Sequence, residues 1–313
     1  MKISPVTPAD LARCVLSVPP LALGADLSLA AEENRKLVRH IEEGGVSTLL
    51  YGGNANLQAW PVGRLVELLE HIEAIAAPDS WVIPSVGPDY GRLIDSAPLA
   101  RETAFPCFMA LPMTAHHTPS GVERALRDFV QASGKPLIAY IRAENYLAPD
   151  ALARMVESGE VVGVKYAVMR PDLTQDPYLA VLCDAVGRER IVSGAGEVPA
   201  VPHLTAFGLG GFTAGCVCIA PRLSMKVHGA LKAGDMAAVE KWLEPIRPLE
   251  ALRESISPIR VLHDAVTFSG VADMGPISPA LANLEEAHRA PVAEAARALL
   301  AAERALAGQA CAA

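Results

Sequence analysis

Basic runs and aromatic side chains are both scarce in this sequence of 313 residues. Lys and Arg total 27 against 35 Asp and Glu, which gives a formal net charge of −8, and aromatic residues make up 5% of the chain. Proteins that bind nucleic acids combine a basic surface with aromatic stacking platforms. We therefore expect no nucleic-acid partner, and the composition favours a small soluble substrate.

Long apolar runs and disulfide patterns are also missing. The roughly 18 consecutive apolar residues of a membrane span occur nowhere, and residues 1–18 lack the apolar core of a signal peptide. The cysteines show no spacing typical of a disulfide framework. They are Cys14, Cys107, Cys183, Cys216, Cys218 and Cys311. We expect a cytoplasmic protein without membrane contact and without disulfides.

Nucleotide and metal motifs do not occur either. The turn after the first predicted strand reads PPLALGADL, which is not the G-x-G-x-x-G of a dinucleotide-binding fold. Cys216 and Cys218 stand in an apolar strand, where two thiols are more often core residues than ligands. The histidines form no ligand pattern such as H-E-x-x-H. They include His116, His117, His203, His228 and His263. We expect no cofactor and no bound metal.

Short apolar runs alternate evenly with amphipathic stretches along the first two thirds of the chain. Helical periodicity with glycine or proline boundaries marks residues 28–45, 60–76, 118–135 and 148–159. The runs that predict strands are 15–23, 46–53, 81–87, 107–112, 136–141, 161–168, 190–194 and 211–219. Eight strand-then-helix units of this length favour a closed barrel over an open doubly wound sheet.

The strand signal stops near residue 226. Three further helices are predicted over residues 237–254, 257–270 and 285–308. We therefore predict an α/β protein, a (β/α)8 TIM barrel over residues 1–225 with a C-terminal helical extension over 226–313 that packs on the barrel.

An unexpected lysine stands in the sixth predicted strand. Residues 159–170 read GEVVGVKYAVMR, and Val161, Val162 and Val164 give the run the character of a strand covered on both faces. Because burying an ammonium is unfavourable, Lys165 must find a partner, reach water or lose its proton. Reaching water would make it a structural residue, whereas losing the proton would make it a nucleophile.

Two other features fall at the ends of predicted strands. Tyr140 lies near the end of the fifth strand, and the second strand runs into Gly52 and Gly53. Since the C-terminal ends of barrel strands build the active site, these residues would share a pocket with Lys165. An amine nucleophile, a phenol that carries protons and a backbone loop that binds anions suit a 2-oxo acid. Taken singly, such a tyrosine is more often a core residue and a glycine pair is usually a turn.

Four segments resemble the motifs of one family, the dihydrodipicolinate synthase / N-acetylneuraminate lyase family of class I aldolases and dehydratases. They read YIRAENY from residue 140, VVGVKYAV from 161, IVSGAGE from 191 and GLGGFTAGCVCIAP from 208. The resemblance implies a lyase that acts on a 2-oxo acid such as pyruvate. It also implies a homo-oligomer, either a dimer or a tetramer built from two dimers.

The resemblance assigns roles to particular residues. Lys165 would form the Schiff base and Tyr140 would be the acid/base. The other residues would bind substrate: Gly52, Gly53 and Asn54 in the second loop, Gly194 in the seventh loop and Thr213 in the eighth strand. The second loop lacks the family's threonine and glutamate, and the fourth loop lacks its tyrosine, which argues against synthase activity itself.

The segment after the fifth strand also departs from the family, because Ile141 and Arg142 follow Tyr140 where Y-N-x-P is usual. Arg142 or Asn145 would then meet a second polar or anionic group of a longer 2-oxo acid. Two other interpretations stay open. A phosphate site in the seventh loop conflicts with the charge of Glu197, so that loop is interpreted as a wall of the substrate pocket. A catalytically impaired barrel would be a regulatory or keto-acid-binding protein.

Overall fold

The computed structural model describes residues 1–311, and its centre is a closed barrel of eight parallel strands in chain order. The strands are β1 (Leu16–Ser17), β2 (Thr48–Tyr51), β3 (Trp81–Val86), β4 (Phe108–Ala110), β5 (Leu137–Ile141), β6 (Val161–Tyr166), β7 (Ile191–Ser193) and β8 (Gly211–Ala214). The predicted (β/α)8 barrel is therefore confirmed.

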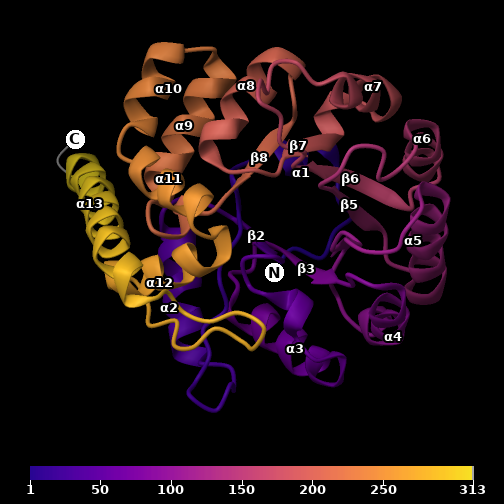
Figure 1. Cartoon of the computed structure of the whole chain (residues 1–313), viewed down its shortest axis with the longest axis horizontal. Helices are drawn as coiled ribbons and strands as arrows, with labels where there is room; N and C mark the ends of the chain where they lie inside the picture. Colours follow the sequence, from indigo (N-terminus) through magenta and orange to yellow (C-terminus); the bar gives the residue numbers. More distant parts are fainter. Residues whose placement is uncertain (312–313) are drawn as a thin grey trace.

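Helices form a ring around the strands, as Figure 1 shows. Those of the barrel are α1 (Pro8–Ala12), α2 (Ala31–Glu43), α3 (Leu65–Ile75), α4 (Tyr90–Arg101), α5 (Pro119–Ser133), α6 (Pro149–Glu157), α7 (Pro177–Val186) and α8 (Glu197–Phe207). The chain continues through α9 (Pro221–Ala233), α10 (Met236–Leu243), α11 (Arg247–Ser255), α12 (Pro258–Ser269) and α13 (Glu286–Cys311). The C-terminal helical extension is thus confirmed.

Every strand is shorter than its predicted run, and the difference is largest for the first and the eighth. The first covers two residues of the run 15–23, because Pro19 and Pro20 carry no N–H for a strand ladder. The eighth ends at Ala214, and Cys216–Cys218 form a 3₁₀ turn where the sequence predicted strand. Both apolar runs stay buried after the strand ends, which is why hydrophobicity alone overestimated their lengths.

One predicted helix is two. Residues 237–254 were expected to be continuous, but α10 ends at Leu243 and α11 begins at Arg247. Pro245 and Pro248 explain the break, since a proline inside a helix removes a hydrogen bond and clashes with the preceding turn. The break turns α11 toward the barrel, where it packs against α8.

Apolar side chains from the strands and the inner helix faces form one buried core. Helix α2 contributes Leu37, Val38 and Ile41 at helical spacing, each at most 1% exposed. The five cysteines whose side chains are described are free and buried, and Cys311 lies outside that set. Among the described residues, no helix is both long and apolar enough to cross a membrane.

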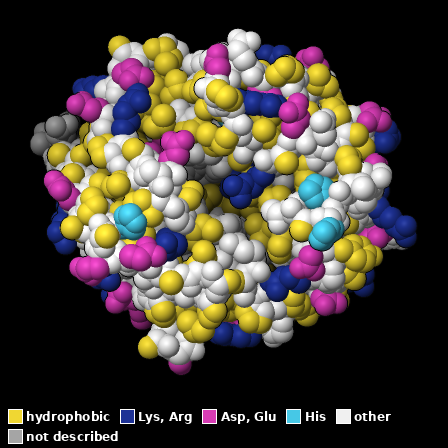
Figure 2. Space-filling model, in the orientation of Figure 1, with side chains coloured by type: hydrophobic (Ala, Val, Ile, Leu, Met, Phe, Trp, Pro, Cys, Tyr) yellow, Lys and Arg dark blue, Asp and Glu magenta, His cyan; other side chains and the backbone are white. Residues whose placement is uncertain are grey.

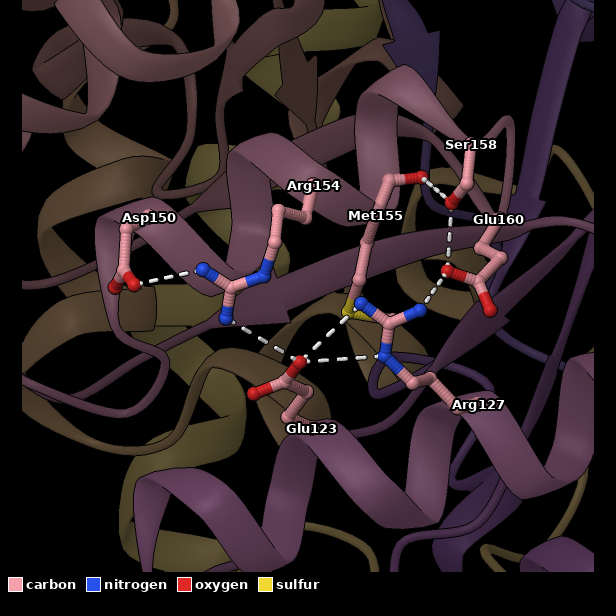
Figure 3. A network of polar contacts seen from close by, with 7 residues as sticks. All are labelled: Glu123, Arg127, Asp150, Arg154, Met155, Ser158 and Glu160. Carbon is pink, nitrogen blue, oxygen red and sulfur yellow. Dashed lines mark hydrogen bonds and ion pairs between the residues drawn. The ribbon is translucent and has the colours of Figure 1, made fainter.

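An ion-pair network joins neighbouring helices on the outside of the barrel. Arg127 of α5 donates to Glu123 one turn earlier, at 3.2 Å, and also to Glu160 just before β6. Arg154 of α6 pairs with Asp150 at 2.8 Å and approaches Glu123 at 3.7 Å (Figure 3). The network therefore ties α5, α6 and the start of β6 together.

Candidate active site

A cavity of about 550 Å³ opens at the C-terminal ends of the strands. Its walls come from the ends of β1, β2, β5, β6, β7 and β8, from α11 and from the first turn of α12. This face of the molecule is hollowed near its centre, and dark blue basic side chains lie at the hollow (Figure 2). A hollow of this size at this end of a barrel is where enzymes of the fold place their chemistry.

Lys165 and Tyr140 lie side by side in this cavity. The two residues are paired in register between β6 and β5, so both side chains point to the same side of the sheet. Lys165 Nζ lies 4.5 Å from the centre of the Tyr140 ring. The predicted amine and phenol are therefore neighbours.

Gly194, directly after β7, leaves room for the Lys165 stem. A Cβ atom at this position would lie 2.9 Å from Lys165 Cγ and 2.9 Å from the Tyr166 carbonyl oxygen. The Gly194 N–H donates to that same oxygen at 2.6 Å. Glycine is thus required for the lysine to pass between β6 and the seventh loop.

Burial changes the acidity of the Lys165 amine. Only 5% of the residue is exposed, and burial lowers its pKa to about 7, with Arg142 and Arg253 adding like-charge repulsion. About half of the amines would therefore be unprotonated at neutral pH, against very few for an ordinary lysine. An unprotonated amine can attack a carbonyl carbon.

Tyr140 keeps its proton at neutral pH. Burial raises the pKa of its phenol above the usual value, and Arg142 offsets part of that effect. A neutral phenol next to a neutral amine can give a proton to an oxygen that leaves the reacting carbon and later take one back.

The second loop places two of its three predicted residues on the cavity. Gly53 and Asn54 line it. Within residues 1–311 their backbone N–H groups donate no hydrogen bond, whereas the N–H groups of Asn56 and Leu57 close the loop onto Gly53 and Gly52. Two free N–H groups at a cavity suit an anion. Gly52 itself is not on the cavity wall.

Of the other predicted substrate-binding residues, three line the cavity and one does not. Arg142, Gly194 and Thr213 line the cavity, with Arg142 exposed at its mouth and Thr213 2% exposed in β8. Asn145 does not line it, because it lies on the exposed part of the fifth loop in a left-handed conformation, with φ of 58°. The seventh loop lines the cavity through Gly194, Ala195 and Gly196.

A network of hydrogen bonds and ion pairs connects the fifth and sixth loops beside Lys165. The Tyr166 hydroxyl donates to Asp176 at 2.7 Å, and Asp176 also pairs with Arg170 at 3.2 Å. Arg170 reaches across to Glu144 in the fifth loop at 3.0 Å. The loop that carries Arg142 is therefore tied to the strand that carries Lys165.

Sequence reasoning missed the contribution of α11. Glu250 and Arg253 line the cavity although each is at most 9% exposed, and they form an ion pair with one another. In the sequence RPLEALRE their charges resemble those of an ordinary solvated helix face. The prolines that separate α11 from α10 were the available signal that this segment changes direction.

A buried acidic group lies behind this ion pair. Glu197 accepts hydrogen bonds from the Val217 N–H and the Ser224 hydroxyl, each at 3.1 Å, and burial together with Glu250 raises its pKa. Glu197, Cys216 and Glu250 place one possible metal ligand each within 4.8 Å of one another. A cation there would have to displace the Arg253 guanidinium, so the cluster is better described as a charge-balanced support for Arg253.

The fold and the site define a class: an eight-stranded barrel with a lysine and a tyrosine paired at the mouth. The chain belongs to the dihydrodipicolinate synthetase family, whose model matches residues 20–299. This result confirms the family that the four sequence motifs predicted.

Individual relatives are distant. A probable 5-dehydro-4-deoxyglucarate dehydratase of Streptomyces coelicolor is 27% identical over 167 residues, which cover 52% of this chain and 51% of that protein. The Streptomyces avermitilis protein of the same name is 25% identical over 54% of this chain and 55% of its own length. The match thus spans about half the length of these curated relatives.

Solved structures agree over nearly the whole chain. The dihydrodipicolinate synthase from Bacillus clausii superimposes with a TM-score of 0.81 at 22% identity and covers 95% of this chain and 99% of its own. The sialic acid aldolase from Ruminococcus gnavus gives 0.79 at 19% identity, with 93% and 98% covered. At these identities the likeness establishes the fold.

Proposed function

We propose that this protein is a lyase that acts on a 2-oxo acid through a Schiff base on Lys165. The observation that carries the proposal is a buried lysine with a pKa lowered to about 7, placed 4.5 Å from the ring of a protonated tyrosine inside a cavity. Membership of a family that contains such enzymes supports it.

The reaction begins at the ketone carbon. The unprotonated Lys165 amine attacks this carbon, the Tyr140 phenol protonates the oxygen, and loss of water leaves the imine. The protonated imine withdraws electrons from the adjacent carbons. It therefore promotes loss of a proton from the adjacent carbon, and the hydroxyl group on the next carbon then leaves with that proton as water. Alternatively, the hydroxyl group loses its proton, the bond between these two carbons breaks, and the resulting enamine carbon takes up the proton. In both cases water hydrolyses the imine and releases the product.

The rest of the cavity holds the substrate in place. We assign the carboxylate next to the ketone to the free N–H groups of Gly53 and Asn54. Gly194 and Thr213 line the wall on the side of β7 and β8, and Arg142 attracts anions at the mouth. Gly52 and Asn145 contact no substrate directly in this proposal, because neither lines the cavity.

The two curated relatives suggest which 2-oxo acid to test first. Their names specify 5-dehydro-4-deoxyglucarate, a sugar acid whose ketone lies next to one of its carboxylates. Loss of water from such a compound would make the protein a carbon–oxygen lyase, whereas release of pyruvate would make it a carbon–carbon lyase.

The experiment is a turnover assay with variants of the two central residues. Purified protein is incubated with 5-dehydro-4-deoxyglucarate or a 2-keto-3-deoxy sugar acid, and products are followed by mass spectrometry. Lys165→Ala should abolish turnover. Tyr140→Phe should slow it by about 10²–10⁴-fold, the usual contribution of a positioned acid/base, while the Schiff base can still be trapped with borohydride.

The outcomes separate the two candidate functions. Turnover that survives in Lys165→Ala would contradict the Schiff-base mechanism. A wild-type protein that forms the adduct with these acids but converts none of them would support a keto-acid-binding or regulatory barrel.

We also propose that the protein is a cytoplasmic homo-oligomer, a dimer or a tetramer. The free, buried cysteines support a reducing compartment. Light scattering of the purified chain tests the assembly, and a monomeric mass would contradict it.

A further inference from the structure

A buried arginine lines the cavity in addition to Lys165 and the exposed Arg142. Arg253 comes from α11, lines the cavity and is 8% exposed. Its guanidinium lies against Gly215, directly after β8, where an added Cβ atom would collide with it. The C-terminal helical segment therefore inserts a buried positive charge between the ends of the barrel strands and the solvent.

The orientation of this guanidinium is fixed by its neighbours. Nη1 donates to Glu250 three residues earlier on the helix, and Nε points to the Pro258 carbonyl oxygen at 3.4 Å. Within residues 1–311, Nη2 donates to no acceptor. Nη1 and Nε therefore hold the guanidinium in place, and among the described residues Nη2 stays free. This arrangement is pre-organised to bind a planar anion such as a carboxylate.

The charges around Arg253 leave it able to attract an anion. Glu250 receives a hydrogen bond from the Cys216 thiol at 3.4 Å in addition to that from Arg253. Glu197 behind it holds a proton, because burial and Glu250 raise its pKa. The charged residues that line the cavity are four basic, Lys165 among them, and two acidic, although the whole chain carries −8. The cavity is therefore positive in a negative molecule.

We propose that Arg253 binds a second carboxylate of the substrate, so that the protein selects 2-oxo acids with a carboxylate at both ends. This inference rests on the proposed function, because the first carboxylate is assigned to Gly53 and Asn54 and the ketone to Lys165. The substrate would then span the cavity from the second loop to α11.

Arg253 suits this role better than Arg142. Arg142 is exposed at the mouth, where water and salt weaken its attraction for an anion. Arg253 is enclosed and held by Glu250, so a carboxylate there meets a charge in a low-dielectric site without reorganisation. Arg142 would assist entry of the anion rather than distinguish its far end.

The experiment compares acids that differ only at the far end. Schiff-base adducts are trapped with borohydride at a series of concentrations and quantified by intact mass. The pairs are 2-oxoglutarate against 2-oxopentanoate and 2-oxoadipate against 2-oxohexanoate, with pyruvate as the reference. The wild type should reach half-saturation at about a tenfold lower concentration of the dicarboxylate in at least one pair, the usual effect of one charge-assisted hydrogen bond.

Variants assign the preference to a residue. Arg253→Gln should reduce the preference ratio to about one, and the double variant Glu250→Gln/Arg253→Gln does the same without leaving a buried carboxylate unpaired. Arg247→Gln is the matched control, since Arg247 lies on the same helix and lines the same cavity but pairs outward with Glu240. It should keep the wild-type ratio.

Three other results would each contradict either the role of Arg253 or the proposed function. Adducts without a preference for dicarboxylates would overturn the role of Arg253 and leave the proposed function intact. A preference lost in Arg142→Gln and kept in both Arg253 variants would overturn the assignment to Arg253. No adduct with any of the acids, pyruvate included, would overturn the proposed function and this inference with it.

Discussion

Lys165 makes the stability of the protein depend on pH in an unusual direction. Its pKa is lowered to about 7 in the folded protein but returns to the ordinary value, about 10.5, when the chain unfolds. Below pH 7 both states carry the charge, and the folded state bears the full penalty of burying it. Between pH 7 and 10.5 the unfolded state binds the extra proton, so this penalty falls as pH rises.

Replacing this lysine should therefore stabilise the protein most at neutral pH and below. Lys165→Met keeps the stem volume and removes the charge. The variant should have a higher free energy of unfolding than the wild type. This difference should be about 2 kcal/mol smaller at pH 9 than at pH 7. Urea unfolding of both proteins at the two pH values measures it. The exposed Lys226→Met should show no such trend, and an equal gain at both pH values would contradict the lowered pKa.

The sequence predicted the position of some cavity residues but not of others. Lys165 and Tyr140 could be found because a charged or polar side chain interrupts an apolar strand near its end. Arg253 could not, because an arginine on an amphipathic helix is normally solvated. Asn145 was selected for its chemistry and for its place in a loop, and neither property says which way a loop residue faces.

At the level of elements, α5 and α6 are joined by charges rather than by apolar contacts alone. Arg127 bridges Glu123 and Glu160, and its side chain is 34% exposed. Ion pairs with this exposure contribute little each, and salt screens them. Figure 3 shows that several share partners, so Arg127 stands at the centre of the group.

Arg127→Ala should lower the free energy of unfolding by about 0.5–1 kcal/mol at low salt and by less at high salt. Denaturation with urea at two sodium chloride concentrations tests this. Arg124→Ala is the control on the same helix, because Arg124 is 84% exposed and approaches its partner Asp128 only to 3.9 Å. A larger loss for Arg124→Ala would contradict the network.

Element types followed from the sequence better than element ends. The alternation of strands and helices predicted the barrel, because each strand-then-helix unit is long enough to be recognised in the sequence. The ends of β1 and β8 were misplaced, since residues after these strands are buried beneath the C-terminal helices and keep a strand-like hydrophobicity. Prolines mark the ends of elements more reliably, as Pro19 does after β1 and Pro245 does after α10.

At the scale of the whole molecule, a buried carboxylate on the last helix contacts the start of α9, the helix that follows the barrel. Glu303 of α13 is 1% exposed and accepts the backbone N–H groups of Arg222 and Leu223, each at 3.1 Å, at the start of α9. It also pairs with the Arg222 guanidinium at 3.0 Å. A residue some eighty positions away thus caps the helix that follows the barrel.

Glu303→Ala should lower the free energy of unfolding by about 2–3 kcal/mol, because the buried Leu223 N–H and the partly buried Arg222 N–H lose their acceptor. Thermal and urea unfolding measure the loss. Glu294→Ala, an exposed carboxylate on the same helix, should change stability by less than about 0.5 kcal/mol. Equal effects for the two variants would contradict the capping role.

The contact between α11 and the barrel mouth is the part of the tertiary structure that the sequence did not predict. Periodicity places a helix in the C-terminal region but does not say which loops it meets. The sequence motifs and the strand order predicted that Lys165, Tyr140 and the loop glycines lie together, whereas Glu250 and Arg253 reach the cavity only through packing over long sequence distances.

The most direct test of the central claim is the mass of the protein after incubation with pyruvate and borohydride at pH 7, followed by peptide mapping. The account predicts one stable adduct, located on Lys165 and absent from Lys165→Ala. The trapping rate should rise with pH up to about 7 and then level off, as the lowered pKa requires. An adduct on another lysine, or none with pyruvate and none with the dicarboxylic 2-oxo acids, would contradict the account.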